Sequence, residues 1–332
     1  MFKPNAIYYE KDILNYPLGR QLMQDFKDIP KFEIANHNNI EEFRKKENKE
    51  FPHMKKNLII GIRKTHKFVP NYKVSNYLVP YTSSGCTAMC LYCYLVCHYN
   101  KCAYLRLFVN REQMLEKIIK TQEKSEDELV FEIGSNSDLI LENTITHNLV
   151  WTIENFSKST RGYLTFPTKF HMVDEILDIP GKEKIIIRVS LNPKSIINKV
   201  ELGTSNLKER IGAIIKLKKA GYKVGILIAP IILVDDYKSL YEELFITIKE
   251  SIPKELLQDI FFELIFMTYS FVHNAINTEA FPNAIKIYNK ELFTSRGMGK
   301  YSYKNSVREE ATIFFKELLK KHFPDNKLWY IS

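Results

Sequence analysis

The sequence predicts an α/β protein built on a partial (β/α)6 barrel, with an N-terminal accessory region before it and a hairpin and helix after it. Strand-like apolar runs alternate with helix-like runs between residues 76 and 270, polar side chains follow several of these runs, and all five cysteines lie within residues 86–102. Such alternation is typical of parallel strands joined by crossover helices. About six units fit an incomplete barrel better than a closed eight-stranded one.

Residues 1–75 form the predicted accessory region. A helix is expected at residues 18–26, a polar and charged segment follows at residues 36–49, and residues 57–63 are predicted to form a strand. Several lysines and arginines flank that strand. They are able to contact phosphates, or simply to keep the edge solvated.

Residues 76–270 form the predicted barrel. The strand-like runs are residues 77–81, 104–109, 128–133, 162–166, 184–192, 222–229 and 260–266, and helices are expected at residues 111–121 and 207–220. Chemistry in a (β/α) barrel gathers at the C-terminal ends of its strands. Polar residues stand there in this sequence: Ser135, Asn136, Ser137, Asp138, Thr168, Lys169, Ser190 and Asn192. Glu132 and Glu263 lie within apolar strands, and a catalytic and a structural role stay equally open for both.

Residues 271–332 form the predicted C-terminal extension. Residues 295–304 resemble a hairpin, with Gly297 and Gly299 in its turn, and a helix is expected at residues 307–322. Residues 284–332 hold ten Lys or Arg against five Asp or Glu, interleaved with aromatic residues. This pattern suits a nucleic-acid backbone with bases stacked on rings, or a packed cap with solvated lysines.

Composition limits the class of protein. The 332 residues are 45% hydrophobic, enough to bury a core without disulfides. The net charge of +9 favours an anionic partner such as nucleic acid, although a solvated lysine-rich surface gives the same sum. No apolar run reaches the length of a membrane span, and the N-terminus has no apolar signal region. We therefore expect a cytoplasmic protein with no membrane partner.

The cysteine loop predicts the chemistry. Cys86, Cys90 and Cys93 are spaced C-x-x-x-C-x-x-C, and three thiolates so close together can ligate three irons of a 4Fe–4S cluster and leave the fourth iron open. A structural zinc site is the alternative, since five cysteines are enough for four thiolate ligands. A disulfide framework fits less well, because the thiols are clustered in a long chain.

The cysteine motif, with Tyr92 before its last cysteine, resembles the radical S-adenosylmethionine (SAM) superfamily. The whole chain is similar to the spore photoproduct lyase family. The segments that carry this resemblance include Asn15-Tyr-Pro-Leu-Gly19, Gly61-Ile-Arg-Lys64, Cys93-Tyr-Leu95, Thr168-Lys-Phe-His171, Ala229-Pro-Ile231, Phe262-Glu-Leu-Ile265 and Gly299-Lys-Tyr301. They run in order almost from end to end of the chain.

The resemblance implies a radical-SAM partial barrel, a 4Fe–4S cluster, SAM and a low-potential electron donor of the ferredoxin or flavodoxin type. The implied substrate is the spore photoproduct, 5-thyminyl-5,6-dihydrothymine, in the DNA of a spore or germinating cell. A 5′-deoxyadenosyl radical would remove a hydrogen from the lesion, two thymines would be restored, and SAM would be regenerated. By residue match, Tyr92 and Tyr94 form a radical relay, and Ser137, Lys169 and Ser190 contact SAM. A lysine also suits the SAM carboxylate as a cation.

Two positions depart from the family pattern. Ser135 stands where the family has its hydrogen-donating cysteine, and Arg296 is displaced by one position in the hairpin. A serine O–H bond is too strong to replace a thiol, so we expect Cys97 or Cys102 to be the donor, with a preference for Cys97. We expect the hairpin to contact the DNA through three residues: Arg296, Lys300 and Tyr301.

Two other functions stay open. The first is a radical-SAM enzyme that acts on another substrate, which the serine at position 135 motivates. The second is a zinc-dependent nucleic-acid-binding protein without catalysis.

Overall fold

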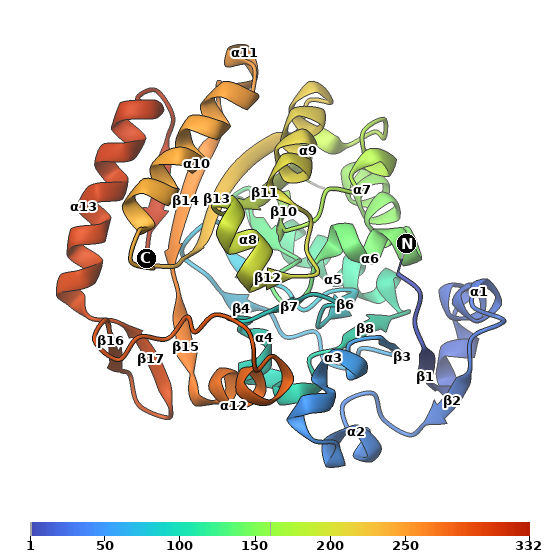
Figure 1. Cartoon of the computed structure of the whole chain (residues 1–332). Helices are drawn as coiled ribbons and strands as arrows, with labels where there is room; N and C mark the ends of the chain where they lie inside the picture. The colour runs from blue at the N-terminus through green and yellow to red at the C-terminus, as the bar shows by residue number, and fades with distance from the viewer. Residues whose placement is uncertain (1, 160) are drawn as a thin grey trace.

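A curled eight-stranded sheet forms the centre of the structure, a computed structural model that describes residues 2–159 and 161–332 (Figure 1). Its strand order is β18-β14-β13-β11-β10-β9-β5-β4. The strands are β4 (Val69–Pro70), β5 (Tyr77–Leu78), β9 (Val130–Glu132), β10 (Tyr163–Thr168), β11 (Ile185–Leu191), β13 (Lys223–Ile231), β14 (Phe261–Phe266) and β18 (Leu328–Ile331). From β5 to β14 six strands run parallel, which confirms the predicted partial barrel. The C-terminal strand β18 adds a further parallel strand at one edge.

Helices follow the barrel strands and pack on the outside of the sheet, as Figure 1 shows for α9 and α10. The helices of this layer are α5 (Arg111–Glu123), α6 (Leu139–Thr146), α7 (Asn148–Ser159), α8 (Lys194–Val200), α9 (Leu207–Lys219), α10 (Tyr237–Ser251), α11 (Lys254–Leu257) and α13 (Asn305–His322). Helix α9 shows why this sequence is helical, because Asn206 and Glu209 form a capping box at its start. Ile211 and Ile214 then face the core at helical spacing.

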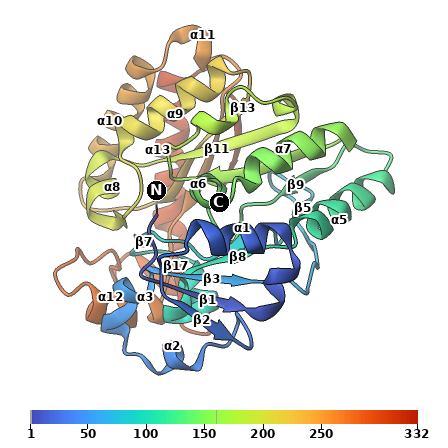
Figure 2. The ribbon, with the colours of Figure 1, turned by 90° about the vertical axis from the view of Figure 1, so that its right-hand side faces the viewer.

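A second sheet of five strands lies beside the barrel, in the order β2-β1-β3-β8-β6 (Figure 2). Its strands are β1 (Ala6–Glu10), β2 (Lys31–Ile34), β3 (Asn57–Gly61), β6 (Ser83–Ser84) and β8 (Leu105–Phe108). The helices around it are α1 (Pro17–Asp25), α2 (Glu41–Lys45), α3 (Phe51–Met54) and α4 (Leu95–Tyr99). The 3₁₀ turns in the described part of the chain are η1 (Lys11–Asn15), η2 (Asn48–Glu50), η3 (Asn100–Cys102), η4 (Asp174–Ile176) and η5 (Lys182–Lys184).

The run at residues 104–109 was expected among the barrel strands, and that placement is wrong. It forms β8, which pairs with β3 in the second sheet. The reason is packing: Leu105 and Leu107 are fully buried and join the core of the N-terminal region with Ile7 and Leu58. Strands β6 and β8 thus cross the boundary predicted at residue 75, and β18 crosses the one at residue 270. The division 1–75, 76–270 and 271–332 stays a prediction about folding units.

A three-stranded sheet joins the end of the barrel region to the C-terminal extension and is formed by β15 (Thr268–Ser270), β17 (Lys300–Tyr303) and β16 (Phe293–Ser295). Strands β16 and β17 make the predicted hairpin, and its turn has positive φ at Gly297, Met298 and Gly299. Helix α12 (Phe271–Ala280) follows β15 directly. No helix in the described part of the chain is long and apolar enough to cross a membrane.

Candidate active site

A cavity of about 770 Å³ opens at the C-terminal ends of the barrel strands. Residues from the cysteine loop, from the segments after β9 and β10, and from the ends of β11, β13 and β14 line it. Eight of the predicted site residues are among them: Cys86, Cys90, Cys93, Tyr92, Tyr94, Ser137, Lys169 and Ser190. The structure therefore brings the predicted cluster ligands, relay tyrosines and SAM contacts to one cavity.

The cysteine loop has a defined backbone. Gly85 precedes it with φ +76°, and a Cβ there would lie 1.9 Å from the Tyr104 carbonyl oxygen, so only glycine fits. The short strand β7 (Met89–Cys90) pairs with β12 (Glu201–Leu202). A turn then places the Cys93 amide 3.0 Å from the Cys90 carbonyl oxygen. The loop is thus anchored on both sides of Cys90.

The three thiols of the C-x-x-x-C-x-x-C motif all line the cavity. Burial raises the pKa of the Cys86 thiol to about 11 and raises that of Cys90 as well, so a metal must supply the energy for ionisation. Within the described residues, no three His, Cys, Asp or Glu side chains are arranged to hold one metal ion. Three thiolates on one loop are able to ligate three irons of a 4Fe–4S cluster.

Side chains from distant segments hold the loop backbone in place. Lys55 donates from Nζ to the carbonyl oxygens of Cys86 and Ala103, both at 2.7 Å. On the other side, His273 in α12 lies with Nε2 2.9 Å from the Cys93 carbonyl oxygen. Sequence reasoning missed Lys55 and His273, because nothing in their neighbourhoods marks a contact with the cysteine loop.

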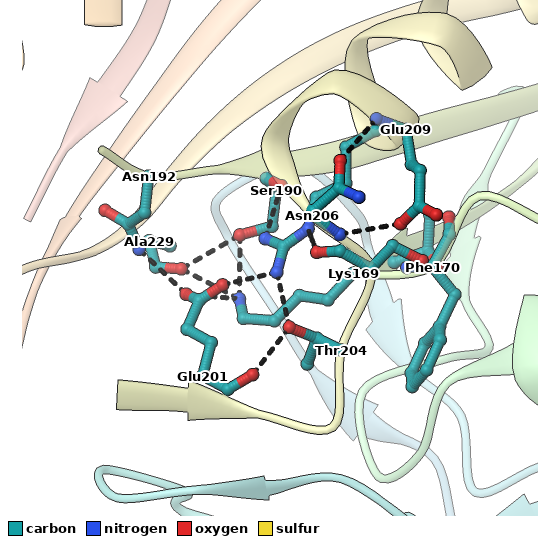
Figure 3. A network of polar contacts seen from close by, with 12 residues as sticks. Lys169, Phe170, Ser190, Asn192, Glu201, Thr204, Asn206, Glu209 and Ala229 are labelled. Atoms are coloured by element: carbon teal, nitrogen blue, oxygen red, sulfur yellow. Dashed lines mark hydrogen bonds and ion pairs between the residues drawn. The ribbon is translucent and has the colours of Figure 1, made fainter. Parts of the chain in front are cut away.

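Lys169 is fixed at the end of β10 by neighbours from two other strands (Figure 3). Its Nζ donates to Ser190 Oγ at 2.7 Å and to the Ala229 carbonyl oxygen at 2.8 Å. Ser190 Oγ also lies 2.9 Å from that carbonyl oxygen. The ammonium group therefore has a defined position at the cavity. A cation held in this way is able to bind an anionic group of a ligand.

Glu201 is the centre of a buried polar network beside Lys169 (Figure 3). It forms an ion pair with Arg210 at 2.6 Å and accepts from Asn192 Nδ2 at 2.9 Å. Burial opposes its ionisation, but Arg210 and Lys169 outweigh this effect and lower the pKa of Glu201 to about 2. The Tyr92 hydroxyl donates to the same carboxylate. Burial, followed by the charge on Glu201, raises the pKa of Tyr92, which therefore stays protonated. Sequence reasoning missed this network.

Serines after β9 form the wall of the cavity near the start of α6. Ser137 Oγ accepts from Ser83 Oγ at 2.7 Å, and Asp138 caps α6 by accepting from the amides of Ile140 and Leu141. Ser135, which the resemblance matches to the family's donor cysteine, also lines the cavity. The family pattern predicts a thiol at that position, and the chain has a hydroxyl there.

Neither candidate donor thiol is among the residues that line this cavity. Cys97 lies in α4, with Sγ 3.4 Å from Ser270 Oγ, and it is exposed. Cys102 lines a second, smaller cavity instead. Tyr94, predicted to belong to the radical relay, lines the larger cavity and is 46% exposed. The donor role of both thiols stays a prediction.

Glu132 and Glu263 both point into the barrel, where they meet Arg188 of β11. The guanidinium Nη2 lies 3.0 Å from Glu132, Nη1 lies 3.3 Å from Glu263, and all three residues are buried. Tyr330 of β18 donates to Glu263 at 3.2 Å. This arrangement gives both carboxylates a structural partner.

The predicted DNA-contacting residues lie on the hairpin, away from the cavity lining. Arg296 Nε donates to Ser302 Oγ at 2.6 Å, and both Arg296 and Lys300 are exposed. Tyr301 is half-buried, with its ring 5.2 Å from that of Tyr288. Their contact with DNA stays a prediction.

Comparisons with known proteins agree over the whole chain. The family model "Spore photoproduct lyase" matches residues 2–332. The spore photoproduct lyase of Bacillus subtilis (strain 168) is 32% identical over 339 residues, covering 100% of this chain and 99% of the relative. That of Clostridium acetobutylicum is 30% identical and covers 98% of each chain.

Solved structures are similar too. A spore photoproduct lyase complexed with dinucleoside spore photoproduct superposes with a TM-score of 0.93 at 29% identity, covering 100% of this chain and 99% of that one. A mutant of such an enzyme with bound AdoMet and the same dinucleoside also gives a TM-score of 0.93, at 28% identity and with the same coverage. A full-length family match, together with a relative above 30% identity, leads to one conclusion: the chain belongs to the spore photoproduct lyase family.

Proposed function

We propose that this chain is a radical-SAM lyase that repairs DNA by reversing the spore photoproduct to two thymines, with regeneration of SAM. One observation carries the proposal. In a chain that matches the family from residue 2 to residue 332, the cysteine triad, the polar side chains after β9 to β11 and the two tyrosines line one cavity. Its volume of about 770 Å³ is in the range of small-molecule and cofactor sites.

The residues present suit both cofactors. Cys86, Cys90 and Cys93 would ligate the cluster and leave one iron open, and Lys169 with Ser137 would hold polar groups of SAM. When bound, these cofactors supply the carbon-centred radical that removes a hydrogen atom from the lesion. The chain's contribution is to orient the reacting groups in a largely apolar cavity that limits side reactions with water.

Tyr92 and Tyr94 flank Cys93 and are proposed to carry the hydrogen back at the end of the reaction. The hydrogen bond from the Tyr92 hydroxyl to Glu201 fixes the phenol in one orientation. Tyr94 lines the same cavity but is 46% exposed to solvent. This exposure supports Tyr94 as the residue that exchanges a hydrogen with a donor outside the cavity. Tyr92 is the one held among the buried groups.

The hydrogen donor is proposed to be Cys97, with Cys102 as the alternative. The donor's S–H bond breaks and its hydrogen forms the thymine methyl group. The thiyl radical then takes a hydrogen from the Tyr94 O–H, and the tyrosyl radical is quenched, by way of Tyr92, by the return of the hydrogen that was first removed from the lesion. Cys97 is in the same helical turn as Tyr94, since its amide lies 2.9 Å from the Tyr94 carbonyl oxygen. That proximity favours Cys97, although its thiol must turn away from Ser270 to take part.

The proposal also includes partners and a compartment. The substrate is the lesion in DNA, and a ferredoxin- or flavodoxin-type protein is proposed to reduce the cluster. The basic net charge of +9 suits both a nucleic acid and an acidic donor protein. We place the protein in the cytoplasm of a sporulating or germinating cell.

The deciding experiment is incubation of the reconstituted, reduced protein with SAM and a lesion-bearing dinucleotide. Release of intact thymines with catalytic SAM supports repair. Cleavage of SAM without thymine release would favour another substrate, as the serine at position 135 suggests. A colourless protein that holds zinc and no sulfide after anaerobic purification would favour a non-catalytic nucleic-acid-binding protein.

A further inference from the structure

A second cavity, of about 390 Å³, lies beside the first. The residues that line it are Asn38, Arg44, His98, Tyr99, Asn100, Lys101, Cys102 and Arg106. His98 lines both cavities, so the two adjoin each other. The proposed reaction assigns no role to this cavity, apart from naming Cys102 as an alternative donor.

The lining of the second cavity is strongly cationic. Arg44, Lys101 and Arg106 all line it, and among the described residues no Asp or Glu does. Arg106 is only 3% exposed, yet in the described part of the chain no carboxylate forms an ion pair with it. A buried cation without a counter-ion is unfavourable unless other groups compensate for its lost hydration. Backbone carbonyl oxygens and two tyrosine rings provide part of this compensation, and an anion in the cavity would add the missing counter-charge.

Arg106 is held as a rigid recognition group. Its Nε lies 3.2 Å from the His37 carbonyl oxygen, and Nη2 lies 2.9 Å from that of Cys102. The rings of Tyr99 and Tyr104 lie 4.8 and 4.4 Å from its guanidinium carbon. Its orientation is therefore set before any ligand binds, and a preorganised guanidinium loses little entropy when it binds a phosphate.

The remaining lining residues add donors around Arg106. Arg44 is exposed on α2, and in the described residues no carboxylate pairs with it. Asn100 has φ 52° and ψ −143°, a sparsely populated conformation for a residue with a side chain. Its Oδ1 accepts from the Lys101 amide at 2.7 Å, which leaves its Nδ2 available as a donor. Strain of this kind is concentrated at binding sites.

We propose that this cavity binds a backbone phosphate of the DNA strand that carries the lesion. The inference rests on the proposed function and deepens it, since it names a contact for the substrate outside the reaction cavity. A strand whose lesion lies in the first cavity continues past His98 to the second. The phosphodiester is the anion that repeats along that strand, and fixed cations beside a base pocket determine the position of the strand.

The test compares two substrates in the reconstituted enzyme. One is the dinucleoside photoproduct, which has no flanking phosphates, and the other is a short duplex that carries the lesion. The variants are Arg44→Ala and the double variant Arg44→Ala with Lys101→Ala. The matched control is Lys45→Ala, because Lys45 lies on the same helix, pairs with Glu41 at 2.7 Å and does not line the cavity.

We expect Arg44→Ala to weaken duplex binding roughly five- to tenfold at low salt and to lower the salt slope by about one. The double variant should weaken it further, Lys45→Ala should have little effect, and all variants should release thymine from the dinucleoside at the wild-type rate. A wild-type enzyme that released no thymine from the dinucleoside would contradict the proposed function itself.

Three results would overturn the phosphate site alone. One is unchanged duplex affinity and salt slope in the double variant. The second is a double variant that binds the duplex with unchanged affinity and turns over with dithionite as reductant, but not with a reduced flavodoxin. That result would make the cavity a docking site for an acidic protein. The third is that inorganic phosphate inhibits the dinucleoside reaction of the wild type but not that of the double variant, while both bind the duplex with the same affinity. That result would indicate a site for free anions.

Discussion

At the scale of single residues, the cysteine loop depends on how its thiols become ionised. Cys86 and Cys90 are buried, and burial raises the pKa of each above its ordinary value. Without iron they are therefore neutral thiols at pH 7. The cluster must provide the energy that ionises them, so its assembly and the order of the loop are coupled.

The first prediction concerns the ligands. Cys86→Ala, Cys90→Ala or Cys93→Ala should each abolish both the cluster and SAM cleavage, because no other side chain replaces the missing thiolate. Cys97→Ala and Cys102→Ala should keep the cluster. Iron and sulfide content after anaerobic reconstitution measures both effects. Loss of iron in Cys97→Ala would mean that the ligands are assigned wrongly.

The second prediction concerns the hydrogen donor. Replacing the true donor, Cys97 or Cys102, by Ala should leave hydrogen abstraction intact, but the thymine radical should form off-pathway adducts and SAM should be consumed. Product analysis by mass spectrometry separates these outcomes. In such a variant, Ser135→Cys should restore clean thymine, since position 135 lines the cavity. Clean repair by the double variant Cys97→Ala with Cys102→Ala would exclude both thiols.

The third prediction concerns Glu201. Glu201→Gln leaves the buried Arg210 without its counter-charge and should lower the free energy of unfolding by roughly 3–5 kcal/mol at pH 7. The folded pKa of Glu201 is about 2 against an ordinary 4.5, so its stabilisation is complete above pH 4.5 and is lost as the pH falls toward 2. Denaturation of wild type and variant should therefore converge over that window.

Glu310→Gln serves as the matched control for Glu201. Glu310 forms an exposed ion pair with Lys238, and exposed pairs contribute little to stability. If the difference between wild type and Glu201→Gln stayed constant from pH 7 to pH 2, the lowered pKa would be wrong.

At the scale of elements, the C-terminal hairpin and the cysteine loop are connected through α12. Strand β15 pairs with β17 of the hairpin and leads directly into α12, whose His273 contacts the Cys93 carbonyl oxygen. Met298 at the hairpin tip is 94% exposed, which is unusual for a large apolar side chain. The exposed residues Arg296 and Lys300 flank this tip, and cations in such positions suit contact with a phosphate backbone.

The fourth prediction tests this hairpin. Arg296→Ala and Lys300→Ala should each weaken binding to lesion-bearing DNA and reduce its salt dependence, because each removes one cation from the phosphate contacts. Binding isotherms across a salt titration measure the effect. The cluster absorbance should not change, since neither side chain lines the cavity. Unchanged binding in both variants would place the hairpin outside the DNA interface.

At the scale of the whole molecule, the C-terminal strand brings the two edges of the barrel sheet together. Strand β18 pairs with β14 at one edge, and Lys73, between β4 and β5 at the other edge, donates to Ser332 Oγ at 3.0 Å. Trp329 stacks on Phe261, with ring centroids 3.9 Å apart. The last residues of the chain thus cover apolar surface of the barrel and protect the edge of β14.

The fifth prediction tests this closure. Trp329→Ala should lower the free energy of unfolding by roughly 1–3 kcal/mol, because it removes a half-buried aromatic contact. Chemical denaturation measures the change. Tyr72→Ala is the control, since Tyr72 is 92% exposed and its removal should change stability by less than about 0.5 kcal/mol. Equal stability of the two variants would show that the stacking of Trp329 on Phe261 does not stabilise the closure.

Short-range patterns in the sequence determined the fold class and the residue types of the site. The spacing of Cys86, Cys90 and Cys93 is a local property of one loop, and the alternation of strands and helices needs only windows of some ten residues. Polar residues after strands, such as Lys169 and Ser190, were predictable because parallel strands end at one edge of the sheet. These features are predictable without knowledge of the strand order.

Strand order and register decided the rest, and only the tertiary structure contains them. Tyr92 and Glu201 are 109 positions apart and meet because β7 pairs with β12. The run at residues 104–109 has the pattern of a barrel strand, but its packing partners lie in the N-terminal sheet. Arg106 reads as an ordinary charge within that run, yet it is buried against Tyr99 and Tyr104. Long-range contacts of this kind depend on how every element packs, so no local pattern determines them.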